Sequence, residues 1–194
     1  MIETLDDART ADLALVQSAR SGDDSARAAL YERHRDDSFR VAYRLLGNEH
    51  DALDVVQDAM IKAFAGLHDF DGRCGFRTWL LRIVQNTALD WGRKRKRQAI
   101  VFRSEAASQS DEFAVAVDPA GRIHQQELRQ ILDRALDHLS PSLRTTFVLH
   151  AELGLSYKEI AETQDVPIGT VMSRIHAAKK KLQAVLDWNQ LHDL

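Results

Sequence analysis

Cysteine is almost absent from this chain, since Cys74 is the only one among 194 residues. A single thiol excludes an internal disulfide and a thiolate-rich metal site, which is typical of a reducing compartment. Long apolar runs are lacking too, because none approaches the roughly 20 residues that span a bilayer. The acidic start, Met1 to Asp7, lacks the basic and then apolar order of a secretory signal. We therefore expect a cytoplasmic protein with no membrane insertion.

The short motifs of common enzymes are also missing. The sequence has no HExxH, no phosphate-loop glycine pattern and no nucleophile elbow. Its eight histidines are scattered, and a scattered histidine is far more often a surface or satisfied residue than a ligand. We expect no catalytic residue, metal or cofactor, so the chain is not predicted to be an enzyme.

Positive charge is concentrated in one segment, although the formal net charge is −3. Between Arg73 and Arg103 there are nine basic residues and one acid, Asp90. Such a local excess indicates an anionic partner, while the acidic remainder keeps non-specific DNA binding weak. A basic run at a helix end can also be merely solvated and favourable for the helix dipole.

Apolar residues recur every three or four positions wherever they are dense, which predicts an all-α fold. We expect helices over about residues 12–20, then up to 46, and over 49–65, 76–97, 141–153, 156–163 and 167–187. In the helix over 49–65, the predicted buried side is Leu53, Val56, Met60 and Phe64. The predicted exposed side is acidic and carries Asp51, Asp54, Gln57, Asp58 and Lys62.

Periodicity disappears over residues 98–117, where serine and acidic residues give a linker composition. The sequence therefore predicts two small helical domains, residues 1–97 and 118–194, joined by a flexible linker. The second restarts at Asp118-Pro119, an N-cap followed by proline at the first helical position.

The second domain has the proportions of a helix-turn-helix between Ser156 and Leu182, with a capping box at Ser156 and Glu159. The predicted shared core is Ile160, Ala161, Val166, Val171 and Ile175. The predicted outward face, which suits a major groove, carries Thr170, Ser173, Arg174, Ala177 and Lys181. A trihelical bundle with a solvated lysine-rich end is the alternative.

Aromatic residues accompany the basic segment of the first domain, and aromatics with cations are what unstacked bases need. The spacing of Phe76 and Trp79 favours core positions for both. We therefore expect a pocket for an extruded base in the loop Phe70 to Gly75. Cys74 lies in this loop, where a redox role is a minor alternative.

Two sets of motifs in this chain resemble one family. Asp54-Val55-Val56-Gln57-Asp58, Phe70-Asp71-Gly72 and the stretch from Phe76 to Asn86 are similar to the second region of extracytoplasmic-function sigma factors. Leu139-Ser140-Pro141, Gly154 to Ala161 and Val166 to His176 are similar to their fourth region. The resemblance runs in the family's order from about Ala26 to Leu186.

This resemblance implies a sigma factor that binds core RNA polymerase and promoter DNA, with an anti-sigma factor as a further partner. By position, the implied polymerase contacts are Asp54, Gln57 and Asp58. The implied contacts with the minus-ten element are Phe70, Arg73, Arg77, Asn86, Arg93, Lys94, Arg95 and Arg97. Those with the minus-thirty-five element are Thr170, Ser173, Arg174, Lys179, Lys180 and Lys181.

The chain departs from the family in its recognition helix. Met172 and Ala177 stand where basic or polar residues are common, so promoter contacts are expected to be unusual. Asp165 replaces the turn glycine, which predicts a slightly strained left-handed residue.

A stand-alone helix-turn-helix regulator remains the alternative function. Such a protein usually dimerises, whereas a monomer with poor binding to duplex promoter would favour a sigma factor.

Overall fold

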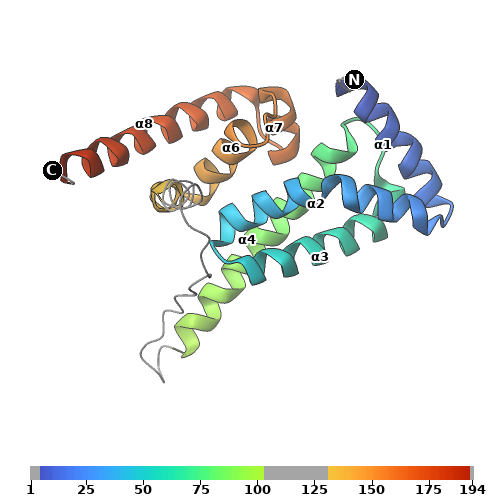
Figure 1. The fold of residues 1–194 in the computed structure, drawn as a ribbon, viewed down its shortest axis with the longest axis horizontal. Coiled ribbons are helices and arrows are strands. Elements are labelled where there is room, and N and C mark those ends of the chain that lie inside the picture. The colour runs from blue at the N-terminus through green and yellow to red at the C-terminus, as the bar shows by residue number, and fades with distance from the viewer. Residues whose placement is uncertain (1–4, 103–130, 193–194) are drawn as a thin grey trace, which may run out of the picture.

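The computed structural model describes residues 5–102 and 131–192, and within these ranges it is helical without strands (Figure 1). The first half contains α1 (Leu5–Arg20), α2 (Asp24–Leu46), α3 (Glu49–Ala65), the short 3-10 helix η1 (Leu67–Asp69) and α4 (Phe76–Phe102). The second contains a helical segment over 131–137, then α6 (Pro141–Ala151), α7 (Tyr157–Gln164) and α8 (Ile168–His192). The predicted all-α class is confirmed. No helix in the described ranges is both long and apolar enough to cross a membrane.

Side-chain caps and glycine determine where the helices of the first half begin and end. Asp23 is the N-cap of α2 and accepts hydrogen bonds from the backbone amides of Ser25 and Ala26. Gly47 ends α2 in the left-handed conformation at φ 69°, as predicted, and its amide bonds to the carbonyl of Tyr43. Asn48 then caps α3 by accepting from the amide of Asp51.

The core of the first half lies among α2, α3 and α4, which pack on one another. Leu30, Val41, Val55, Leu80 and Val84 are fully buried there. Helix α1 is held against α2 by a buried carboxylate. Asp12 lies 3.0 Å from Nε2 of His34 and accepts a 3.1 Å hydrogen bond from Arg33. The pairing compensates for the loss of water around the acid.

The second half is a small three-helix unit in which α8 packs on both α6 and α7. Its core contains Leu149, Leu155, Ile160, Val171 and Ile175, all buried. Helix α8 lies on the outer side of the molecule, while α6 and α7 face the first half (Figure 1).

The two halves contact each other, α6 against α2 and α7 against α4. Helix α4 continues to Phe102, past the predicted domain boundary at residue 97. The remainder of the predicted linker and the predicted helix start at Asp118-Pro119 lie outside the described residues. The boundaries 1–97, 98–117 and 118–194 therefore stay a prediction.

Candidate nucleic-acid interface

Helix α3 presents a mixed acidic and apolar surface to solvent. Asp54, Gln57 and Asp58 are exposed, as predicted. Leu53 is 52% exposed and Ile61 60% exposed on the same side, so the predicted burial of Leu53 is wrong. The inward side is centred on smaller residues, Ala52, Val55, Val56, Ala59 and Ala63, and their close packing on α2 and α4 turns Leu53 outward.

The loop before α4 does not expose its leading aromatic residue. Phe70 is only 2% exposed, and its ring packs edge-on to Phe76 at 5.8 Å and at 5.3 Å from Trp79. Arg20 donates a 2.9 Å hydrogen bond to the carbonyl of Leu67 and another to that of Phe70. Phe70 is thus part of the core and is not available to stack on a base. The sequence pattern could not distinguish a core position from a base-stacking position for Phe70, because an aromatic residue suits both.

Cys74 lies half-buried in the same loop. Burial, followed by the negative charges of Glu162 and Asp71, raises the pKa of its thiol. The group is therefore kept protonated rather than activated as a nucleophile.

Arg73 and Arg77, predicted to contact the minus-ten element, have different surroundings. Arg73 is exposed and forms an ion pair with Asp71. Arg77 donates a 2.7 Å hydrogen bond to Asp37 of α2 and a 3.0 Å bond to the backbone carbonyl of Leu153 in the second half. Arg77 therefore joins the two halves in this structure.

The second part of α4 gathers the other predicted contacts. Asn86, Arg93, Lys94, Arg95 and Arg97 are all exposed. A cleft of about 640 Å³ between α3 and α4 is lined by Trp91, by four cations and by two carboxylates: Lys62, Arg93, Lys94, Arg97, Asp58 and Asp90. Two ion pairs, Arg93 with Asp90 and Arg95 with Asp51, partly neutralise this end.

This cleft was not predicted, because the sequence placed the base pocket in the loop from residue 70. Trp91 is half-buried, so part of its indole remains accessible beside the cations. An indole beside guanidinium and ammonium groups is an arrangement that binds unstacked nucleobases. The signal in the sequence was Trp91 itself, two residues before the basic run.

In the second half, α7, a short turn and α8 form the predicted helix-turn-helix. The capping box is present, since Ser156 accepts from the Glu159 amide and the Glu159 carboxylate accepts from the Ser156 amide at 2.8 Å. Asp165 lies in the left-handed region at φ 54° and ψ 52°, as predicted. Its carboxylate accepts a 3.0 Å hydrogen bond from Arg82 of α4.

The outward face of α8 differs in detail from the prediction. Ser173, Lys179, Lys180 and Lys181 are exposed, but Thr170 and Arg174 are half-buried. Arg174 donates a 2.9 Å hydrogen bond to Oε1 of Gln164 and so points towards α7. One nitrogen of its guanidinium is therefore bonded within the domain.

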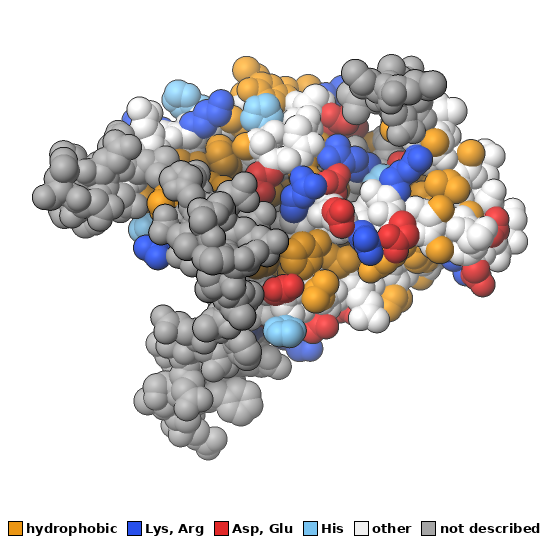
Figure 2. All heavy atoms as spheres, viewed as in Figure 1, with side chains coloured by type: hydrophobic (Ala, Val, Ile, Leu, Met, Phe, Trp, Pro, Cys, Tyr) orange, Lys and Arg blue, Asp and Glu red, His pale blue; other side chains and the backbone are white. Residues whose placement is uncertain are grey.

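A cluster around Arg44, at the end of α2, connects the halves. Its Nε donates a 3.0 Å hydrogen bond to Glu152, and its Nη1 binds Asp133. Burial lowers the pKa of Arg44, but the hydrogen bonds and charges of the two carboxylates raise it on balance. Figure 2 shows Lys and Arg side chains lying beside Asp and Glu side chains across the middle of this face.

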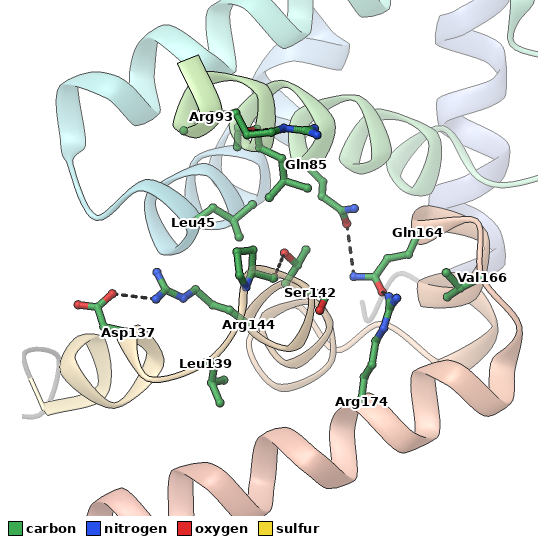
Figure 3. A pocket seen from close by; sticks show the side chains of 15 residues that line it. Leu45, Gln85, Arg93, Asp137, Leu139, Ser142, Arg144, Gln164, Val166 and Arg174 are labelled. Carbon is green, nitrogen blue, oxygen red and sulfur yellow. Dashed lines mark hydrogen bonds and ion pairs between the residues drawn. The ribbon is translucent and has the colours of Figure 1, made fainter. Parts of the chain in front are cut away.

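A cleft of about 820 Å³ lies beside this cluster, between the halves. Figure 3 shows Leu45, Gln85 and Arg93 on one side of it. Leu139, Arg144 and Arg174 lie on the other. Gln164 and Gln85 bridge it with a long 3.5 Å hydrogen bond. Within the described residues, no group of three or more His, Cys, Asp or Glu residues could hold a metal ion.

Comparison with known proteins gives two family matches. Residues 30–98 match Sigma-70 region 2, and residues 129–182 match Sigma-70, region 4. The chain is 32% identical over 184 residues to the ECF RNA polymerase sigma factor SigW of Bacillus subtilis, covering 92% of this chain and 96% of SigW. It is 39% identical over 159 residues to SigE of Mycolicibacterium smegmatis, covering 81% of this chain but only 60% of that relative.

Among solved structures, CnrH in complex with the cytosolic domain of CnrY is 32% identical, with a TM-score of 0.69 over 91% of this chain and 97% of that one.

Proposed function

Because this chain belongs to the extracytoplasmic-function sigma factors of RNA polymerase, we propose that it docks on core polymerase through α3 and presents α4 and α8 to the two elements of a promoter. Its function is promoter-directed initiation of transcription. It acts by binding, without catalysis of its own, in the cytoplasm. The supporting observation is that the family's two regions occur together, each with an exposed helical face.

Polymerase docking is assigned to the α3 surface of Leu53, Asp54, Gln57, Asp58 and Ile61. Exposed carboxylates give electrostatic complementarity to a basic partner. Two exposed apolar side chains on the same face add area that gains stability when covered. A surface of this composition is suited to a protein partner rather than to DNA.

The decisive experiment is binding of the labelled chain to core polymerase. Asp54→Lys with Asp58→Lys should weaken binding more than tenfold, about 1.4 kcal/mol. Glu32→Lys with Asp36→Lys is a matched control, because these acids are also exposed and have the same spacing on α2. The control should bind like wild type. Failure of the folded wild-type chain to bind core polymerase would refute the proposal and favour a stand-alone regulator.

Recognition of the minus-ten element is assigned to the exposed residues of α4, Asn86, Arg93, Lys94, Arg95 and Arg97, and to Arg73 in the loop that precedes α4. Trp91 joins them as a stacking surface in the cleft between α3 and α4. Trp91→Ala should weaken binding of a single-stranded minus-ten oligonucleotide to the complex with polymerase about tenfold. Tyr31→Ala, which removes an exposed aromatic residue from α2, should leave it unchanged; equal loss in both variants would contradict the assignment.

Recognition of the minus-thirty-five element is assigned to α8, with Ser173 facing bases and Lys179 to Lys181 contacting phosphates. Residues 1–97 and 118–194 would then act as separate DNA-reading domains across the linker 98–117. The solved structure of CnrH contains the cytosolic domain of CnrY. We assign an anti-sigma factor to this chain as a third partner.

A further inference from the structure

The outer face of α8 begins with apolar side chains where a DNA-reading helix commonly has polar ones. Ile168 is 46% exposed and Met172 54% exposed. They are four residues apart and therefore lie on one face. Ser173 and His176 are exposed beside them. The structure thus holds a large unburied apolar pair at the tip of its helix-turn-helix.

Over the first nine residues of α8 the exposed face carries no lysine or arginine, and its longest polar side chain is His176. Over residues 168–176, all within the described part of the chain, Arg174 is the only side chain of the kind that binds guanine bidentately. It is half-buried and donates to Gln164. Thr170 is also half-buried. Bidentate reading of guanine by an arginine of these turns is therefore disfavoured, and His176 is left to offer a single hydrogen bond.

The remaining chemistry matches thymine. Thymine is the base that presents a methyl group in the major groove, and apolar side chains recognise it there. Ser173 donates its hydroxyl hydrogen to the carbonyl of Thr170 at 2.9 Å, so its oxygen is left to accept from an amino group of adenine or cytosine. Adenine pairs with thymine, so an A·T pair presents both groups in the major groove: an amino group for the Ser173 oxygen and a methyl group for the apolar side chains.

The middle of α8 is basic, which favours nucleic acid as the occupant of this face. From Ile168 to Val185 the sequence contains four basic residues and no acid. Lys179, Lys180 and Lys181 are exposed, about two turns beyond Met172. Lysines at that position orient a helix on the phosphate backbone without reading sequence.

We propose that Ile168 and Met172 determine promoter specificity by contacting thymine methyl groups in the minus-thirty-five element. The inference rests on the proposed function, because it specifies what the DNA-reading face of α8 recognises. It predicts a preference for A·T pairs at the positions under these two side chains, with the thymine on the strand whose methyl group contacts them. Recognition there depends on apolar contact rather than on hydrogen bonds from arginine.

The test replaces thymine by deoxyuracil, which removes the methyl group and keeps base pairing. A preferred element is first selected from random duplexes with the full-length chain bound to core polymerase. Each thymine is then replaced singly. Wild type should bind about threefold to fivefold more weakly at the contacted positions, as loss of one buried methyl group implies. Met172→Ala and Ile168→Ala should each abolish that sensitivity at one position.

Two controls make the result specific. Ile131→Ala removes an exposed apolar side chain outside α8 and should retain the full sensitivity to deoxyuracil. Met172→Arg should shift the selected element towards guanine at its position. Circular dichroism of each variant checks folding, which these exposed substitutions should leave intact.

The inference is overturned if the selected element lacks thymine, or if deoxyuracil weakens wild type and both alanine variants equally. It is also overturned if the alanine variants bind the element like wild type, as expected if a protein partner covers this pair. Core binding is measured in the same samples. If the wild-type chain does not bind core polymerase, the proposed function is refuted. If it binds core polymerase but its DNA binding does not depend on the thymine methyl groups, only this inference is refuted.

Discussion

The ion-pair cluster of Arg44 should make a measurable contribution to the contact between the halves. Arg44 is 13% exposed and Glu152 18% exposed, while Asp133 is more accessible. Exposed ion pairs contribute at most about 1 kcal/mol, and removal of one partner of a fully buried pair costs about 3–5 kcal/mol. The partial burial here places Arg44→Met between these limits, at a loss of about 2 kcal/mol.

Such a loss would lower about thirtyfold the ratio of molecules whose two halves are in contact to molecules whose halves are apart. We would measure it by energy transfer between dyes attached to the two halves, and by urea unfolding of the same variants. Glu152→Gln and the double variant complete a thermodynamic cycle, in which the coupling should be about 1–2 kcal/mol. Arg93→Met is the control, because it breaks a highly exposed pair within α4 and should cost no more than about 0.5 kcal/mol. Zero coupling between Arg44 and Glu152, or an equal loss in the control, would refute the reasoning.

Four further outcomes are expected. Ser156→Ala removes the α7 capping box and should lower the free energy of unfolding by about 1 kcal/mol in urea titrations; an unchanged midpoint would contradict the role of the cap. Asp165→Ala should cost about 1 kcal/mol because alanine tolerates positive φ poorly, whereas Asp165→Gly should not, and the same titration compares them. Hydrogen bonds from Ser25 and then Ala26 lower the pKa of Asp23. The stability from this cap should therefore be complete above the ordinary carboxyl pKa of about 3.9 and be lost as pH falls through the lowered pKa. Asp23→Asn should flatten that part of the pH profile of unfolding. Burial raises the pKa of Cys74, so iodoacetamide should label it more slowly than free cysteine at pH 7, and a rate equal to that of free cysteine would contradict a buried, protonated thiol.

Helix existence and several helix ends could be predicted from the sequence because they depend on neighbours along the chain. The helix over 49–65 was predicted with the bounds of α3, and Gly47 ends α2 as expected. The Ser156 capping box and the left-handed Asp165 are equally local. The exposure of Asp54, Gln57 and Asp58 followed from the helical period.

The orientation of particular side chains could not be predicted in this way. Leu53 is one position from Ala52 on the helix, and only close packing on α2 and α4 determines which of the two faces inward. The sequence alone allowed Phe70 either a core or a base-binding role. The contacts of its ring with Phe76 and Trp79 place it in the core. Arg174 was predicted as a DNA contact, and its hydrogen bond to Gln164, ten positions away, became known only from the structure.

By itself the sequence determined an all-helical chain, the family regions and the acidic and basic faces, since short-range periodicity, caps and motif order encode these. Tertiary structure alone decided which cations remain accessible to DNA, because Arg44, Arg77 and Arg82 bind groups from the other half. It also revealed Ile168 and Met172 as exposed apolar side chains at the start of α8. These outcomes depend on pairs of residues far apart in the chain, whose distance is determined by how the helices pack and by the loss of water around buried charge.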